Sequence, residues 1–151
     1  RRFRHSLVDA AGRGVRVVLL MQGYTDHRLY KLAARALYRY FLDRGVEIHE
    51  YHAGFLHAKV AVVDDDWATV GSSNIDPFSL LLSREANLVV RDRRFAGELR
   101  ASLQGVLTTG THRIRHQTLR RLPWHERLAS WLLYTAVRVG AGLTGYARGE
   151  V

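Results

Sequence analysis

Residues 56–87 read LHAKVAVVDDDWATVGSSNIDPFSLLLSREAN, and they predict the central hairpin of the fold. Side chains of residues 57–63 alternate between two faces, as in a β-strand, with alanine and valine filling one face. The three aspartates of Asp64–Asp66 predict a turn, and Trp67–Gly71 predicts the return strand. The segment therefore predicts a strand, a tight turn and a second strand.

Six residues of this stretch follow the spacing H-x-K-x4-D-x6-G-S-x-N. They are His57, Lys59, Asp64, Gly71, Ser72 and Asn74. His57 and Lys59 stand two apart on the predicted strand, so their side chains emerge from the same face. A charged lysine has no free lone pair, which makes the pair a poor metal site. The pair suits a phosphate, because the ammonium offsets the phosphate charge while the imidazole attacks or transfers a proton.

The other small or polar motif residues and a later carboxylate suit the same chemistry. Ser72 and Asn74 offer neutral hydrogen bonds to phosphate oxygens, and Gly71 allows close backbone approach. The Glu85 carboxylate can orient an imidazole and stabilise its charged form. Taken singly, each residue also has an ordinary reading as a surface histidine, a solvated lysine, an acidic turn or a surface ion pair. The joint match to the whole spacing favours the functional interpretation.

The segments before the hairpin alternate between helical and strand patterns. Residues 2–13 and 28–44 carry apolar residues at helical spacing, and Gly45 ends the second helix. Residues 15–21 form a nearly continuous apolar run and residues 46–51 alternate, so both predict strands. This order predicts an α/β fold in which helices flank a mixed, mostly parallel sheet.

The segments after the hairpin predict one more strand and one more helix. Residues 86–90 predict a buried strand, and Asp92 predicts the N-cap of a helix that runs to about Thr108. Residues 109–123 are basic, and we expect them to be irregular or partly helical.

The end of the chain differs in character. Residues 123–146 read PWHERLASWLLYTAVRVGAGLTGY, and residues 128–147 hold one formal charge, Arg138, over the length of a membrane span. That charge and three glycines weaken a transmembrane interpretation, so an interfacial amphipathic helix and a packed terminal helix stay open beside it. We expect one domain over residues 1–110, followed by a basic linker and an amphiphilic helical tail over residues 111–151.

Composition limits the class of protein. Hydrophobic residues make up 47% of 151 residues, which is enough for a folded domain, and the absence of cysteine excludes disulfides, thiol catalysis and cysteine zinc sites. A net charge of +9 favours a polyanionic partner, either nucleic acid or an anionic membrane. The chain begins at Arg1 inside a helical pattern, so we expect it to be the later part of a longer protein.

Residues 57–74, HAKVAVVDDDWATVGSSN, resemble the HKD motif of the phospholipase D superfamily. The continuation NIDPFSLLLSREANLVV and the preceding RALYRYFLDRGVEIHEYHAGFLHAK resemble the bacterial cardiolipin synthase branch, and the tail resembles its B-like group. The resemblance covers most of residues 12–135. It implies a phospholipase D-like half-domain and a phosphatidyltransferase of phospholipid biosynthesis.

The resemblance also implies a mechanism with two HKD motifs. One histidine attacks phosphorus and forms a phosphohistidine, while the other protonates the leaving alcohol and then activates the acceptor. No metal or other cofactor is implied. His57 lies in what resembles the second motif, which implies the role of general acid and base.

Roles for the remaining motif residues come from the same resemblance. Lys59 and Asn74 would hold phosphate oxygens, with Ser72 in support. Glu85 would hydrogen-bond a catalytic histidine, which we expect in the other half of the enzyme. Asp64 would be structural.

The chain contains one H-x-K pair, at His57, so it holds half of such a site and we expect it to be inactive alone. Its partners would be the missing N-terminal HKD half or a second copy of itself, and an anionic phospholipid such as phosphatidylglycerol. We expect it at the cytoplasmic side of a bacterial cell membrane, held peripherally or by its tail. Two alternatives stay open: a homodimeric single-HKD nuclease or phosphodiesterase acting on nucleic acid, and an inactive half-domain that serves as a binding module.

Overall fold

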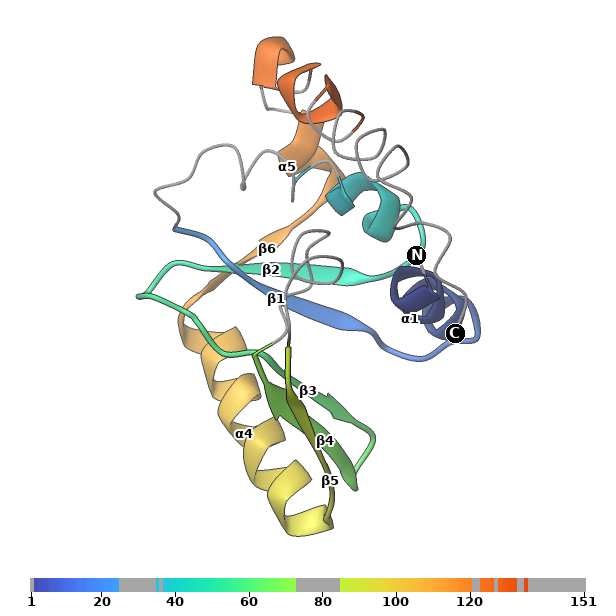
Figure 1. Cartoon of the computed structure of the whole chain (residues 1–151). Helices are drawn as coiled ribbons and strands as arrows, with labels where there is room; N and C mark the ends of the chain where they lie inside the picture. Colours follow the sequence, from blue (N-terminus) through green and yellow to red (C-terminus); the bar gives the residue numbers. More distant parts are fainter. Residues whose placement is uncertain are drawn as a thin grey trace.

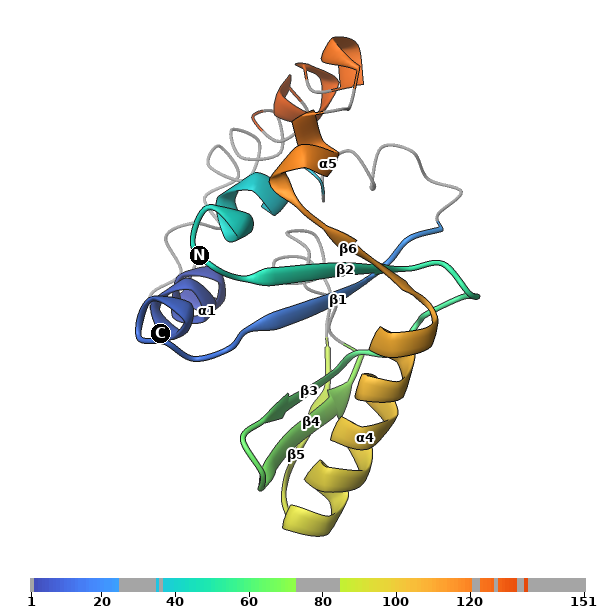
Figure 2. The same ribbon diagram turned by 180° about the vertical axis from the view of Figure 1, so that it is seen from behind.

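The chain forms two small sheets with helices packed around them (Figure 1, and from behind in Figure 2). This computed structural model describes residues 2–24, 35, 37–72, 85–120, 123–126, 128–132 and 135. The elements in chain order are α1 (Arg2–Gly12), β1 (Val18–Gln22), β2 (Glu47–Tyr51), β3 (Val60–Val63), β4 (Trp67–Gly71), β5 (Asn87–Arg91), α4 (Arg93–Thr109), β6 (Thr111–Ile114) and α5 (His116–Arg120). Residues 37–42 and 128–132 are also helical.

The first sheet has the strand order β1-β2-β6 and carries the main core. β1 runs parallel to β2, whereas β6 pairs with β2 in the antiparallel sense. Apolar side chains from the sheet meet those of the helix over residues 37–42, and their burial stabilises the fold. The buried members are Tyr38, Phe41, Val46, Ile48 and Ile114.

The second sheet is an antiparallel meander with the order β3-β4-β5. Helix α4 runs alongside it in both views (Figures 1 and 2). Ala68 on β4 and Ala96 on α4 are both 0% exposed, and their small side chains let the helix approach the sheet closely. The hairpin predicted around the Asp64–Asp66 turn is therefore confirmed, although its first strand is shorter than expected.

Helix boundaries fall where the sequence predicts them. The Asp92 carboxylate accepts a hydrogen bond from the Phe95 amide at 2.7 Å and caps α4. Gly45 takes a φ of +82°, and it lies three residues after the helix ends at residue 42. Residues 28–34 and 36, the earlier part of the predicted helix, lie outside the described residues.

The α/β class is confirmed, but three details differ from the expectations. Among the described strands only β1 and β2 are parallel, whereas the other three strand pairs, β2–β6, β3–β4 and β4–β5, are antiparallel. Residues 86–90 do form most of a strand, yet Leu88 and Val89 are 67% and 55% exposed rather than buried. Residues 109–123, expected to be irregular or partly helical, contain the helix α5 and also the strand β6, which was not expected.

The beginning of the predicted tail is helical. Residues 124–126 and 128–132 have helical backbone, and Trp124 and Trp131 are 74% and 61% exposed. Within the part of the chain that the structure describes, no helix is both long and apolar enough to cross a membrane. Residues 136–147, the rest of the predicted tail helix, lie outside the described part, and the division of the chain at residue 110 stays a prediction.

Candidate active site

The motif histidine lies in the connection between the two sheets. His57 is exposed, and residues 55–59 have no regular structure, so the strand predicted from residue 57 begins only at Val60. The reason lies in the hydrogen bonds: pairing with β4 starts where the Gly71 amide donates to the Lys59 carbonyl oxygen at 2.9 Å. The backbone before His57 is bound instead by the side chain of Gln22, at Gly54 and Leu56.

Lys59 and His57 nevertheless stay close together. The Lys59 ammonium Nζ donates to the backbone carbonyl oxygen of His57 at 3.0 Å. The His57 ring stacks on Phe55, with ring centroids 5.7 Å apart and an interplanar angle of 12°. Phe55 is 79% exposed, so among the described residues the imidazole has one aromatic neighbour, and it stays accessible from solvent.

Ser72 and Glu85 form a second polar group just beyond the paired ends of β4 and β5. The Ser72 hydroxyl donates a short hydrogen bond to Glu85 Oε2 and accepts one from the Ala86 amide at 3.1 Å. The Ser72 amide also donates to the Ala86 carbonyl oxygen at 3.0 Å. Ser72 therefore joins the end of β4 to the segment that enters β5. The predicted bond from Glu85 to a histidine stays a prediction, since its described partner is Ser72.

Gly71 is required by the neighbouring strand. A Cβ atom at this position would collide with the Asn87 side chain Oδ1 and the Ala86 carbonyl oxygen. The close backbone approach predicted for Gly71 is real, but in the described structure the approaching group is β5.

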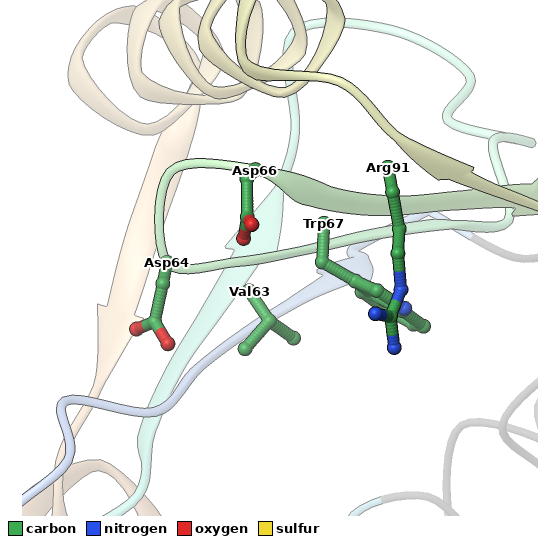
Figure 3. A pocket seen from close by; sticks show the side chains of 5 residues that line it. All are labelled: Val63, Asp64, Asp66, Trp67 and Arg91. Atoms are coloured by element: carbon green, nitrogen blue, oxygen red, sulfur yellow. The ribbon is translucent and has the colours of Figure 1, made fainter.

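Asp64 lies at the opposite end of β3 from His57. Its φ is +49°, a left-handed conformation that aspartate tolerates better than most residues. It borders a shallow pocket of about 370 Å³, where Val63, Trp67 and Arg91 point from neighbouring strands to one side of the sheet (Figure 3). This position agrees with the structural role expected for Asp64, which stays a prediction.

The predicted site consists of the five motif side chains other than Gly71, together with Glu85. The structure brings four of these six residues to one end of the second sheet: His57, Lys59, Ser72 and Glu85. Asp64 lies at the other end, and Asn74 falls outside the described residues. In the described part of the chain, no group of three or more histidine, aspartate or glutamate side chains is arranged to hold a metal ion.

Gln22 is a site-related residue that sequence reasoning missed. Its side-chain oxygen accepts from the Leu56 amide at 2.7 Å, and its side-chain nitrogen donates to the Gly54 carbonyl oxygen at 3.3 Å. The available signal was its place directly after the apolar run of β1, at the carboxyl end of a strand. Functional groups gather at that end in parallel α/β sheets.

A buried carboxylate lies on the strand that precedes the site loop. Glu50 on β2 is 3% exposed, and its oxygens lie 3.7 Å from Arg35 Nε and 3.4 Å from His52 Nε2. The pKa of the nearby Tyr38 hydroxyl is raised, first by burial and then by the negative charge of Glu50. Tyr38 is therefore a neutral hydrogen-bond donor at ordinary pH, and the buried Glu50 lies close to His52 at the start of the loop.

Comparison with known proteins identifies the relatives of this chain. The family model described as "Cardiolipin synthase, PLD-like domain" matches residues 1–107. Cardiolipin synthase B of Escherichia coli K12 is 41% identical over 145 residues, which cover 96% of this chain and 35% of the relative. Minor cardiolipin synthase ClsB of Bacillus subtilis is 30% identical over 129 residues, covering 85% of this chain and 32% of that protein. The chain thus spans about a third of the length of these curated relatives.

A solved structure supports the fold independently. The crystal structure of Nuc from Salmonella typhimurium, a phospholipase D family member, matches with a TM-score of 0.61 at 20% identity. The match covers 74% of this chain and 72% of Nuc, so the described fold is that of a phospholipase D family member. Because the family model spans most of the chain, the resemblance inferred from the HKD spacing is confirmed, and the chain belongs to the family of cardiolipin synthase phospholipase D-like domains.

Proposed function

We propose that this chain supplies one half of a phosphatidyltransferase site, which transfers a phosphatidyl group between anionic phospholipids through a phosphohistidine. The observation that carries the proposal is the placement of Lys59 and His57. The Lys59 ammonium lies 3.0 Å from the backbone carbonyl oxygen of His57, and the His57 imidazole is exposed. A cation bound to the backbone of a residue whose ring can transfer protons suits a phosphodiester, because negative charge develops on the phosphate oxygens during transfer.

In the proposed reaction, a histidine of the other half attacks phosphorus as the bond from phosphorus to the leaving alcohol breaks. His57 gives its proton to the leaving oxygen and becomes a neutral base. It then takes a proton from the acceptor alcohol, which attacks the phosphohistidine and releases the first histidine. Lys59 and Asn74 hold the phosphate oxygens, Ser72 supports them, and Glu85 accepts a hydrogen bond from a catalytic histidine.

The other half of the site comes from the N-terminal HKD half of the protein or from a second copy of this chain. Relatives about three times as long as this chain support the first source. The substrate we propose is phosphatidylglycerol in a bacterial cell membrane, approached from the cytoplasmic side. A net charge of +9 and the exposed tryptophans of the tail support peripheral or tail-anchored attachment to an anionic surface.

A second candidate is a single-HKD nuclease or phosphodiesterase that acts as a homodimer. The match to Nuc favours it, since it covers most of a phospholipase D family member of similar size. The basic charge would suit a nucleic acid as well as a membrane. A chain that assembles no second motif would instead be an inactive binding module.

Incubation of the protein, as its cell makes it, with phosphatidylglycerol vesicles should yield cardiolipin, measured by mass spectrometry. A parallel reaction with DNA and EDTA tests the second candidate. Replacing His57→Ala removes the proposed acid and base, so we expect transfer to fall by about 10²–10⁴-fold or more. His5→Ala, at an exposed position on α1, is the matched control and should keep full activity.

Cardiolipin formation that survives His57→Ala would refute the assigned site. Cleavage of DNA without cardiolipin formation would replace the proposal with the nuclease. If the full protein binds phosphatidylglycerol vesicles but catalyses neither reaction, the inactive binding module becomes the supported function.

A further inference from the structure

We propose that Gln22, at the end of β1, is a positioning residue that holds the loop carrying His57 in its active conformation. This inference rests on the proposed function of His57. It concerns residues 53–58, the connection between the two sheets. The His52 amide is fixed by the Gly110 carbonyl oxygen at 2.9 Å, and the far end begins to pair with β4 at Lys59.

Between those two ends, the loop backbone is bound by one residue from outside the loop among those that the structure describes, and that residue is Gln22. One carboxamide accepts from the Leu56 amide at 2.7 Å and donates to the Gly54 carbonyl oxygen at 3.3 Å. These contacts bracket Phe55, the residue that stacks on His57. The first contact also fixes the peptide unit between Phe55 and Leu56, one residue before His57. Both the backbone and the aromatic neighbour of the imidazole therefore depend on one side chain.

The chemistry of the two contacts selects glutamine. An amide nitrogen of the backbone can only donate and a carbonyl oxygen can only accept, so the partner must do both at once. A carboxamide does so, whereas an ionised carboxylate accepts at both oxygens and a leucine does neither. The orientation of the Gln22 amide is set by these partners.

Gln22 is itself held firmly. It belongs to β1, where it pairs with Tyr51 of β2, and the next residue continues the ladder through a 2.8 Å bond from the Gly23 amide to the Tyr51 carbonyl oxygen. The first sheet thus acts as a fixed base, and the Gln22 side chain connects that base to the loop. Catalytic groups lose rate steeply when displaced by about 1 Å, so a loop held by such a contact has a direct effect on transfer.

The experiment compares Gln22→Leu, which keeps the approximate size and removes both hydrogen bonds, with Gln22→Glu, which keeps the acceptor for Leu56. We expect kcat for transfer from phosphatidylglycerol to fall about 10–100-fold in Gln22→Leu, with KM changed by less than about threefold. Gln22→Glu should lie between this variant and the unmodified protein. Gln104→Leu, at an exposed position on α4, is the control and should not change either constant.

A second readout does not depend on activity. The His57 ring protons feel the ring current of Phe55, so their NMR shifts should move in Gln22→Leu toward those of Phe55→Leu. Unchanged His57 shifts, or a kcat within twofold of the unmodified value in Gln22→Leu, would overturn the inference. Should that variant fail to fold, the same two readouts on Gln22→Glu decide. If activity survives His57→Ala, the proposed function itself is wrong. That result differs from a failure of the Gln22 inference, in which His57→Ala abolishes activity but Gln22→Leu has no effect.

Discussion

At the scale of single residues, the HKD spacing contains positions that the structure ties to the fold and positions that we propose serve the chemistry. Gly71 and Asp64 belong to the first kind: one lies against β5, and the other takes a left-handed turn conformation. His57 is exposed and Lys59 half-buried, and the Lys59 ammonium binds the backbone carbonyl oxygen of His57 at the end of the sheet. A motif match alone does not separate the two kinds of position, because the same spacing pattern includes residues required by the fold and residues with reactive side chains.

Gly71→Ala tests a motif position that the structure ties to the fold. The added methyl group would collide with the Ala86 carbonyl oxygen and with Asn87, so β5 must shift away from β4. We expect the free energy of unfolding to fall by about 1–3 kcal/mol in a urea titration. Gly97→Ala is the matched control: nothing lies within 4 Å of its new Cβ on α4, and it should stabilise the helix by about 0.5–1 kcal/mol. Equal effects of the two changes would contradict the predicted collision.

At the scale of elements, a chain of polar contacts joins β2, β6 and α4. The Thr111 hydroxyl on β6 donates to the Leu107 carbonyl oxygen of α4 at 2.8 Å. It therefore accepts from His49 Nδ1 on β2, which lies 3.1 Å away. This arrangement leaves Nε2 of His49 without a proton when the ring is neutral. Burial lowers the pKa of His49, and this outweighs the attraction of Glu47.

The lowered pKa predicts how stability depends on pH. In the unfolded chain His49 takes up a proton near its ordinary pKa of about 6.5, while the folded protein resists protonation until a lower pH. The free energy of unfolding should therefore decrease as the pH falls from about 7.5 through 6.5 and below. In His49→Asn this decrease should be smaller, measured by urea unfolding at several pH values. His5→Asn, on the exposed side of α1, should leave the decrease unchanged; an unaltered pH profile in His49→Asn would contradict the assignment.

Local signals in the sequence predicted helices and turns better than strand pairing. The Asp92 cap, the Gly45 stop and the aspartate turn were all found, because each depends on residues a few positions apart. β6 was missed, since only Ile114 of its four residues is buried and its partner β2 lies more than sixty residues earlier. Likewise the apolar run of β5 predicted burial, yet an apolar run does not reveal whether anything packs over it.

The candidate site was predicted only in part, because local sequence signals do not report contacts between distant residues. The motif identified the residues with reactive side chains, but their setting depends on contacts over long sequence separations. Gln22 binds the loop at Gly54 and Leu56, over thirty residues later, and no spacing rule reports that contact. The strand expected to begin at His57 begins at Val60, and Gln22 binds the backbone just before His57, at Gly54 and Leu56.

At the scale of the whole molecule, the start of the tail is connected to the first sheet. Arg35 lies 3.7 Å from the buried Glu50 of β2 and 3.6 Å from Glu126 in the tail. Ser130 is 7% exposed, so one side of this helical segment packs against the protein. The other side is apolar and exposed, at the helical spacing of Trp124, Leu128, Trp131 and Leu132. A helix with one packed side and one exposed apolar side, in a chain of net charge +9, suits the surface of an anionic membrane.

Replacing both tail tryptophans should therefore weaken membrane binding without unfolding the protein. Trp124 and Trp131 are 74% and 61% exposed, so Trp124→Ala with Trp131→Ala removes little folded-state packing and should leave the melting temperature within about 2 °C. Sedimentation with phosphatidylglycerol vesicles should show a loss of affinity of about tenfold or more, because each indole would otherwise bury apolar area in the headgroup region. Phe3→Ala, which removes a 47% exposed aromatic ring from α1, is the control and should bind normally. Affinity that is unchanged in the double variant, yet lost in high salt, would show that charge alone attaches the protein and that the apolar side of the tail serves another partner.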